Sequence, residues 1–279
     1  MKKNLLLILF LAISLAFINE AKAAKVDTVE TYSDAMHKKI KAVVYTPEGY
    51  EQGKEYPVVY LLHGAGGKYS DWAKSAAKLA VSSDLYHEII VCVDGSVNSW
   101  YIDSPVDPTY KYETYVAKEL IAYIDKNYKT IKSRTGRAIT GLSMGGHGAL
   151  YLSIKHQDVF GAVGSMSGGV DIRPFPKNWD LAKRLGSYAE YPENWEKNTV
   201  TNMLYLLTPN SLSIIFDCGT EDFFYKVNLE LHEKLLERNI PHDYIARPGG
   251  HTWPYWVNSL NYQLLFFNGY FKKNNPQLN

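Results

Sequence analysis

The sequence has few cysteines, and it lacks the residue groupings that hold cofactors. Only Cys92 and Cys218 occur among its 279 residues, and neither has the paired spacing of a zinc site. Both lie in apolar, strand-like runs, so we expect two packed side chains rather than a disulfide, although an exported protein permits the bridge. The sequence shows no phosphate-binding loop, metal-ligand cluster or cofactor fingerprint, and we expect chemistry without a cofactor or metal.

The chain also lacks an excess of charge of either sign. It has 30 lysines and arginines against 29 aspartates and glutamates. Because it has no strongly basic region, no nucleic-acid partner is expected. Its fractions of apolar residues, 46%, and charged residues, 21%, are those of an ordinary globular protein and leave its oligomeric state open.

A hydrophobic run long enough to span a membrane is missing as well. The apolar run 5–18 is shorter than the roughly 20 residues of a spanning helix; two lysines precede it and Ala21-Lys22-Ala23 follows. This order is typical of a secretory signal peptide over residues 1–23, cleaved after Ala23 or Ala24, with a membrane anchor as the alternative. Cleavage would remove three lysines and one glutamate, leaving 27 basic and 28 acidic side chains. We expect a secreted or periplasmic protein without stable membrane insertion.

Residues 24–279 contain no internal repeat, low-complexity tract or linker, so a single domain is expected. Apolar runs of strand length alternate with helical patterns, which predicts an α/β fold whose mostly parallel sheet carries helices on both faces. The strand runs are 40–46, 57–62, 89–94, 138–142, 162–166, 213–218 and 243–247, and the helical patterns are 113–128, 145–157, 226–239 and 254–272. An irregular insertion at about 170–210 fits neither pattern, and its tryptophans favour a functional segment over a disordered one.

The stretch Gly141-Leu142-Ser143-Met144-Gly145 matches G-x-S-x-G between a strand pattern and a helix pattern. This context predicts a nucleophile elbow, in which a strained turn exposes the serine above the sheet and a helix N-terminus faces any anion formed beside it. The alternative is a glycine-rich turn with an incidental serine. An aspartate and then a histidine follow Ser143, in the chain order of α/β-hydrolases, and this order favours the nucleophile.

The expected base and acid are chosen by their positions in loops. His251 follows Gly249-Gly250 beyond a strand, where an imidazole could lean over the sheet edge as general base. Asp222 lies in the loop that would reach His251, whereas Asp217 lies inside a predicted strand, so Asp222 is the preferred acid. His147 is expected to point away from Ser143, and His63 to organise a loop.

Two backbone donors are expected to stabilise the oxyanion of a tetrahedral intermediate. One is the N–H of Met144, directly after Ser143, and the other is the N–H of Ala65, in the glycine loop after the strand 57–62. Several aromatic residues also fall on predicted loops at the carboxyl edge of the sheet. A single aromatic residue in such a loop is most often part of the core, but as a set these residues could stack on a sugar or an aromatic acyl group. The expected substrate-binding residues are Trp100, Tyr101, Trp179, Trp195 and Trp253.

Five motifs give the sequence a specific family resemblance. In chain order they are VVYLLHGAGG, NSWYIDSP, GLSMGGHGAL, DCGTEDFF and GGHTWPYW. Over residues 24–279 the chain resembles the esterase D-like α/β-hydrolases, which include carbohydrate esterase family one, feruloyl, acetylxylan and tributyrin-type esterases, S-formylglutathione hydrolases and mycolyltransferases. The resemblance implies the α/β-hydrolase fold and a Ser143, Asp222 and His251 triad. Relatives often have arginine where this chain has Asn258, which puts any contact of that arginine in doubt.

The leading hypothesis is a secreted serine carboxylic-ester hydrolase that works through an acyl-Ser143 intermediate on feruloyl or acetyl esters of plant cell-wall polysaccharide. A general short-chain esterase or an acyltransferase is the alternative, because water and another hydroxyl can accept the same acyl group. A non-catalytic binding module is disfavoured by the complete set of serine, aspartate and histidine. Cytosolic hydrolysis of a glutathione thioester fits the fold but conflicts with the predicted signal peptide.

Overall fold

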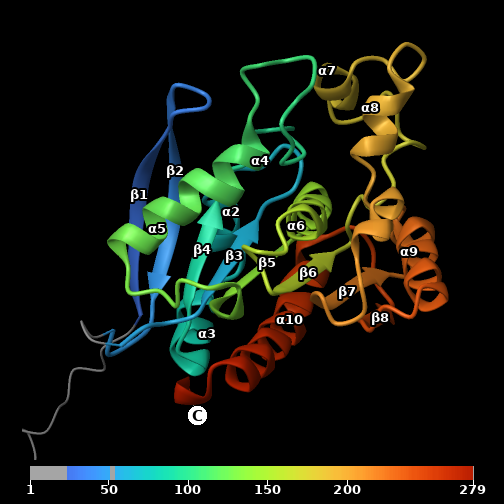
Figure 1. The fold of residues 1–279 in the computed structure, drawn as a ribbon. Coiled ribbons are helices and arrows are strands. Elements are labelled where there is room, and N and C mark those ends of the chain that lie inside the picture. Colours follow the sequence, from blue (N-terminus) through green and yellow to red (C-terminus); the bar gives the residue numbers. More distant parts are fainter. Residues whose placement is uncertain (1–23, 51–53, 279) are drawn as a thin grey trace, which may run out of the picture.

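The computed structural model describes residues 24–50 and 54–278 (Figure 1). The predicted signal peptide 1–23 lies outside the described residues. Eight strands form one sheet in the order β1-β2-β4-β3-β5-β6-β7-β8. β2 pairs antiparallel with β1 and β4, and all other neighbours pair in parallel. The strands are β1 Lys25–Ser33, β2 Lys38–Thr46, β3 Val58–Leu62, β4 Ile89–Val93, β5 Arg137–Gly141, β6 Ala162–Met166, β7 Ser213–Gly219 and β8 Asp243–Arg247.

Helices cover both faces of this sheet, as predicted. One face packs against α2 (Asp71–Ser75), α3 (Leu79–Tyr86) and α10 (Trp253–Asn274). The other face packs against a continuous helix and against α6 (Met144–Lys155) and α9 (Tyr225–Glu237). The continuous helix consists of α4 (Tyr112–Thr114), a π-helical stretch Tyr115–Leu120 and α5 (Ile121–Asn127). The central strands β3 to β6 are buried along their whole length, which explains their unbroken apolar sequences.

The structure adds elements that the sequence patterns do not predict. β1 has three charged residues, Lys25, Asp27 and Glu30, and within the described chain it pairs with β2 alone, so it is a half-exposed edge strand without an apolar run. The segment between β6 and β7 contains α7 (Leu181–Leu185) and α8 (Pro192–Lys197), followed by two short 3₁₀ turns. In Figure 1 this insertion lies beyond the edge of the sheet at which the parallel strands end. The insertion is ordered by packing, because Trp195 is fully buried and its indole N–H donates to the Gly186 carbonyl at 3.0 Å.

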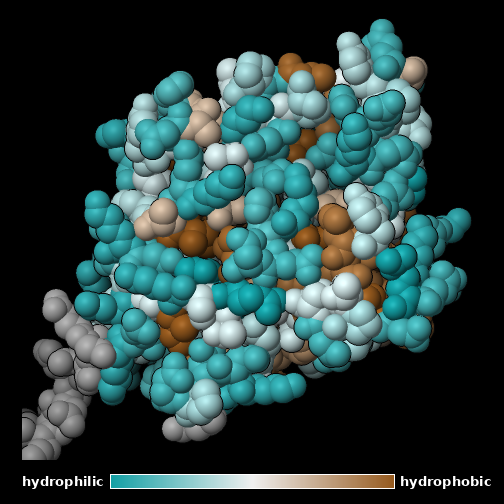
Figure 2. Space-filling model, in the orientation of Figure 1, coloured by the Kyte–Doolittle hydropathy of each residue, from teal (hydrophilic) through white to brown (hydrophobic). Residues whose placement is uncertain are grey.

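The two cysteines are buried and free, as expected. On the face shown in Figure 2 the surface is mainly hydrophilic, and its hydrophobic side chains form separate groups. Within residues 24–50 and 54–278, no helix is both long and apolar enough to cross a bilayer.

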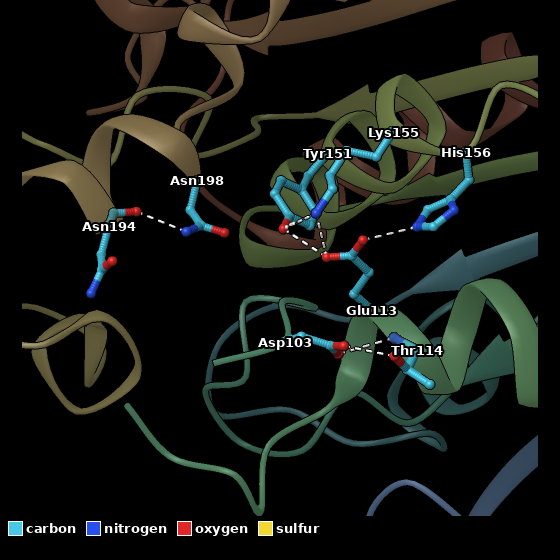
Figure 3. Close-up of polar contacts among 8 residues, drawn as sticks. All are labelled: Asp103, Glu113, Thr114, Tyr151, Lys155, His156, Asn194 and Asn198. Carbon is cyan, nitrogen blue, oxygen red and sulfur yellow. Dashed lines mark hydrogen bonds and ion pairs between the residues drawn. The ribbon is translucent and has the colours of Figure 1, made fainter. Parts of the chain in front are cut away.

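A cluster of polar side chains joins α4 to α6 (Figure 3). The Glu113 carboxylate accepts hydrogen bonds from Tyr151 Oη at 2.8 Å, Lys155 Nζ at 2.6 Å and His156 Nε2 at 2.9 Å. Burial alone would raise the pKa of Glu113, but the hydrogen bonds from His156 and Lys155 outweigh it and lower the pKa to about 2. The folded state therefore keeps Glu113 ionised and favours the connection between the two helices.

We expect Glu113→Gln to lower the free energy of unfolding at pH 7 by on the order of 3 kcal/mol, because the pKa of Glu113 is about 2 when folded and 4.5 when free. A lowered pKa stabilises the fold above the free value, and this stability is lost as the pH falls through the folded value. At pH 3, about half of the difference or less remains. Urea unfolding at pH 7 and pH 3 measures it, with the exposed Glu237→Gln as control. An equal effect at both pH values would contradict the assignment.

Candidate active site

Ser143 occupies a strained turn between β5 and α6. Its backbone has φ 56°, the left-handed region that a non-glycine residue rarely adopts. Two glycines make the turn fit. A Cβ on Gly141 would lie 2.7 Å from the backbone of Gly145, and a Cβ on Gly145 would lie 2.6 Å from the carbonyl oxygens of Leu62 and His63. The predicted strand–turn–helix arrangement is therefore present, and it places Ser143 at the carboxyl edge of the sheet.

Three side chains at this edge form one hydrogen-bonded line. His251 Nε2 lies 2.9 Å from Ser143 Oγ, and His251 Nδ1 lies 2.8 Å from Asp222 Oδ2. The other oxygen of Asp222 accepts the backbone N–H of Phe224 at 2.8 Å. With the Nδ1 proton donated to the carboxylate, the Nε2 lone pair faces the serine hydroxyl. This arrangement can remove a proton from Ser143 and stabilise the resulting imidazolium.

Asp217 has a different environment from Asp222. Its carboxylate is fully buried and accepts hydrogen bonds from Ser259 Oγ at 2.5 Å and Gln263 Nε2 at 2.8 Å, both on α10. Burial raises the pKa of Asp217 to about 6. Asp217 thus joins β7 to α10, while Asp222 is the aspartate that contacts the histidine.

The two expected oxyanion donors lie beside Ser143. Met144 is the first residue of α6, and Ala65 lines the same cleft as Ser143. Within residues 24–50 and 54–278, neither backbone N–H has a hydrogen-bond partner in the protein. Unpaired amides at a helix N-terminus and in a glycine loop are suited to bind a developing negative charge.

His63 fixes the peptide unit that contains the Ala65 N–H. Its Nε2 accepts the backbone N–H of Gly95 at 2.9 Å, so its Nδ1 holds the proton and donates to the Gly64 carbonyl at 2.8 Å. The same carbonyl accepts the backbone N–H of Gly67 at 3.1 Å. Because the Gly64 carbonyl and the Ala65 N–H belong to one planar peptide, the two bonds together set the direction of the amide. Burial lowers the pKa of His63, which keeps the ring neutral and its tautomer constant. The expected loop-organising position of His63 agrees with these contacts.

His147 lies one turn after Ser143 and faces the protein interior. Its Nδ1 and Nε2 lie 3.2 Å and 2.8 Å from the carbonyl oxygens of Trp100 and Asn198. Burial lowers the pKa of His147 to about 4. This side chain connects α6 to the insertion and, as expected, does not contact the serine hydroxyl.

A cleft of about 790 Å³ opens above Ser143, within the usual size range of ligand pockets. Its aromatic walls come from the insertion, from the loop after β7 and from the start of α10. The residues that line it are Gly64, Ala65, Gly66, Gly67, Asp71, Leu142, Ser143, Trp179, Phe223, His251, Thr252, Trp253, Pro254 and Trp256. Another cavity, of about 540 Å³, lies at the opposite edge beside the start of β7, and none of the three hydrogen-bonded residues lines it.

The expected substrate-binding aromatics divide into two groups. Trp179 and Trp253 line the cleft. The expectation for Trp100, Tyr101 and Trp195 is wrong, because these side chains are 1%, 0% and 0% exposed and belong to the core. Trp100 donates its indole N–H to the Trp179 carbonyl at 3.2 Å, and Tyr101 donates its hydroxyl to the His63 carbonyl at 3.1 Å. Trp100 and Tyr101 therefore support the walls of the cleft from the core side.

The cleft also contains side chains that the sequence analysis missed. Phe223 directly follows Asp222, and Trp256 lies one helical turn after Trp253, so motif position and helical spacing could have indicated both. Asp71 is the first residue of α2 and contributes a carboxylate to the wall; its Oδ2 accepts the backbone N–H of Lys68 at 2.9 Å.

Comparisons with known proteins identify the family of this chain. Residues 33–267 match the family described as "Putative esterase". An acetyl esterase of Caldicellulosiruptor saccharolyticus is 27% identical over 71% of this chain and 78% of its own length. A diacylglycerol acyltransferase/mycolyltransferase Ag85A of Mycobacterium leprae is 31% identical over 75% of this chain and 74% of its own. Other matched esterases are longer proteins, of which the chain spans 52% or 23%.

Solved structures show the same fold. A ferulic acid esterase superposes with a TM-score of 0.77 and 30% sequence identity, covering 89% of this chain and 98% of its own. The sheet order, the helices on both faces and this superposition confirm the α/β-hydrolase fold. The family match covers most of the chain, which therefore belongs to this esterase family of carboxylic ester hydrolases.

Proposed function

We propose that this protein is an exported serine esterase that removes feruloyl or acetyl groups from plant cell-wall polysaccharide or its oligosaccharides. The observation that supports catalysis is the hydrogen-bonded line from Asp222 through His251 to Ser143 at the base of an open cleft. Export rests on the signal-peptide pattern of residues 1–23.

The first half-reaction follows from this geometry. His251 Nε2 takes the Ser143 proton while Oγ forms a bond to the ester carbonyl carbon, and the carbonyl π electrons move to oxygen. The N–H groups of Ala65 and Met144 stabilise that oxyanion, and Asp222 stabilises the imidazolium. When the oxyanion collapses, the carbon–oxygen bond to the alcohol breaks. The leaving alcohol takes the proton from His251, and the acyl group remains on Ser143.

The second half-reaction determines whether the enzyme hydrolyses or transfers. Water, deprotonated by His251, attacks the acyl-Ser143 carbonyl carbon. The bond from that carbon to Ser143 Oγ then breaks, Oγ takes the proton back from His251, and the acid is released. A sugar or lipid hydroxyl in the same place would give a new ester, and the 31% identity to an acyltransferase makes transfer the second candidate. A binding module without catalysis would not need all three side chains within hydrogen-bond distance.

The walls of the cleft support an aromatic or sugar-linked substrate. Trp179 and Phe223 stack at a ring distance of 5.9 Å, and Trp253 and Trp256 meet edge to face at 5.6 Å. Such faces suit a hydroxycinnamoyl ring or a sugar ring. The proteins similar to this chain include a ferulic acid esterase and an acetyl esterase, which correspond to the two proposed acyl groups.

Replacement of the nucleophile tests the mechanism. We expect Ser143→Ala to lower kcat by up to about a millionfold and to leave the melting temperature almost unchanged. Asp222→Asn should cost several orders of magnitude in rate, whereas Asp217→Asn should act mainly on stability. Ester hydrolysis and thermal unfolding of the three variants separate these effects. A folded Ser143→Ala variant with a tenth of the activity would exclude the acyl-Ser143 route.

A substrate panel tests the carbohydrate assignment. We expect kcat/KM for feruloyl esters to exceed that for acetyl esters by about ten- to a hundredfold, since two ring contacts would each add roughly 0.5–1.5 kcal/mol beyond area burial. The panel is methyl ferulate, a feruloylated arabinoxylan oligosaccharide, acetylated xylan and tributyrin in one buffer. Trp179→Ala should reduce the preference, and Tyr205→Ala, an exposed ring outside the cleft, is the control. If tributyrin were best and both sugar esters were ignored, the carbohydrate assignment would fail while the serine-esterase assignment stood.

The hydrogen bond from His63 to the Gly64 carbonyl predicts a kinetic effect of a residue that does not contact the substrate. We expect His63→Phe, which removes the bonds to the Gly64 carbonyl and the Gly95 N–H, to lower kcat by about ten- to a hundredfold with KM little changed, because the Ala65 peptide loses one of the two bonds that fix its direction. Tyr101→Phe removes the bond to the neighbouring His63 carbonyl and should cost less than about threefold. Steady-state kinetics on methyl ferulate measure both. A change in KM alone for His63→Phe would contradict the assigned position.

A further inference from the structure

The proposed catalytic base lies among aromatic rings. The His251 imidazole centre is 4.4 Å from the ring centre of Phe223, 4.8 Å from Trp256 and 5.5 Å from Phe224. The rings of Trp256 and Phe224 meet it edge to face, and Phe223 is tilted across it at 40°. Within the described chain its side-chain hydrogen-bond partners are Ser143 and Asp222, and Asp222 is the charged group in contact with it.

Phe223 differs from the other two rings in its exposure. Trp256 and Phe224 are buried, whereas Phe223 is 53% exposed and lines the cleft. One side of Phe223 contacts the imidazole, and Trp179 stacks on it at 5.9 Å with the planes 20° apart. An exposed phenylalanine beside the base is therefore held in place from the insertion.

Trp179 is itself fixed by several contacts. Its ring packs against Phe175 at 5.5 Å and against Phe224 at 5.5 Å, and its carbonyl accepts the indole N–H of Trp100. The next residue, Asp180, accepts a hydrogen bond from Asn98 Nδ2 at 2.9 Å. The insertion thus presents a fixed ring to Phe223 rather than a mobile one.

We propose that Phe223 is a positioning residue for His251, and that Trp179 supports it from the insertion. The ring limits the rotation of the imidazole away from Ser143, and its π electrons attract the positive charge that His251 gains when it takes the serine proton. A cation within about 6 Å of a ring centre is attracted to the ring face even at a partly exposed site. The neutral imidazole lacks this attraction, so the contact favours the transition state over the ground state. This inference rests on the proposed function.

The test uses Phe223→Leu, which keeps an apolar side chain and removes the ring. We expect kcat to fall about two- to fivefold, for an acetyl ester and a feruloyl ester alike. The midpoint of the acidic limb of kcat/KM should move to lower pH by about 0.4–0.7 units, because the protonated base loses stabilisation. Phe223→Tyr, which keeps a ring, should retain the wild-type kcat and the wild-type midpoint of the acidic limb. Trp179→Leu should lower both quantities by less than Phe223→Leu does.

Controls separate this role from substrate binding and from the proposed function itself. Tyr205→Leu removes a more exposed ring outside the cleft and should leave the pH profile unchanged. An NMR titration of the His251 ring in each variant reports the same shift without turnover. If Phe223→Leu raised only KM for feruloyl esters and left the acidic limb in place, the ring would be a substrate contact and the inference would be overturned. A wild-type protein inactive on every ester would overturn the proposed function, whereas an active wild type with an unchanged Phe223→Leu profile would overturn this inference alone.

Discussion

The site depends on the close approach of α6 to the end of β3. There is no room for a side chain at Gly145, since a Cβ would lie 2.6 Å from the carbonyl oxygens of Leu62 and His63. This contact seats the start of α6 directly on the strand that leads into the Ala65 loop. The proposed nucleophile Ser143, the Met144 amide and the Ala65 loop therefore come together through backbone packing, before any side chain of the cleft is considered.

The part of this arrangement that follows chain order could be predicted from sequence. Parallel strands end at one edge of the sheet, so the loops after β5, β7 and β8, which carry Ser143, Asp222 and His251, are expected to lie close together there. Asp222 could be preferred to Asp217 because the latter falls inside β7. β1 could not be recognised, since it is a half-exposed edge strand without an apolar run, and hydrophobic run length detects only strands that are buried on both faces.

The directions of side chains in loops could not be predicted from the sequence. Trp100 and Tyr101 have consecutive left-handed backbones, with φ 56° and 57°, a conformation that no local pattern of two aromatic residues indicates. Their rings are buried beneath these loops, although they were expected to line the substrate pocket. Trp195 is buried for another reason, because α8 packs it against the insertion's own turn. In each case long-range packing determines whether the ring is buried, and composition and residue spacing do not reveal that packing.

The two walls of the cleft have different origins in the chain. Trp253 and Trp256 belong to α10, whose inner face is part of the core, so their positions are tied to the stability of the whole sheet. Trp179 belongs to the segment between β6 and β7, whose Leu181 and Trp195 pack into the core on the other face of the sheet. Each wall is thus tied to the core on a different face of the sheet. A core substitution on one face is therefore expected to displace one wall of the cleft and to leave the other in place.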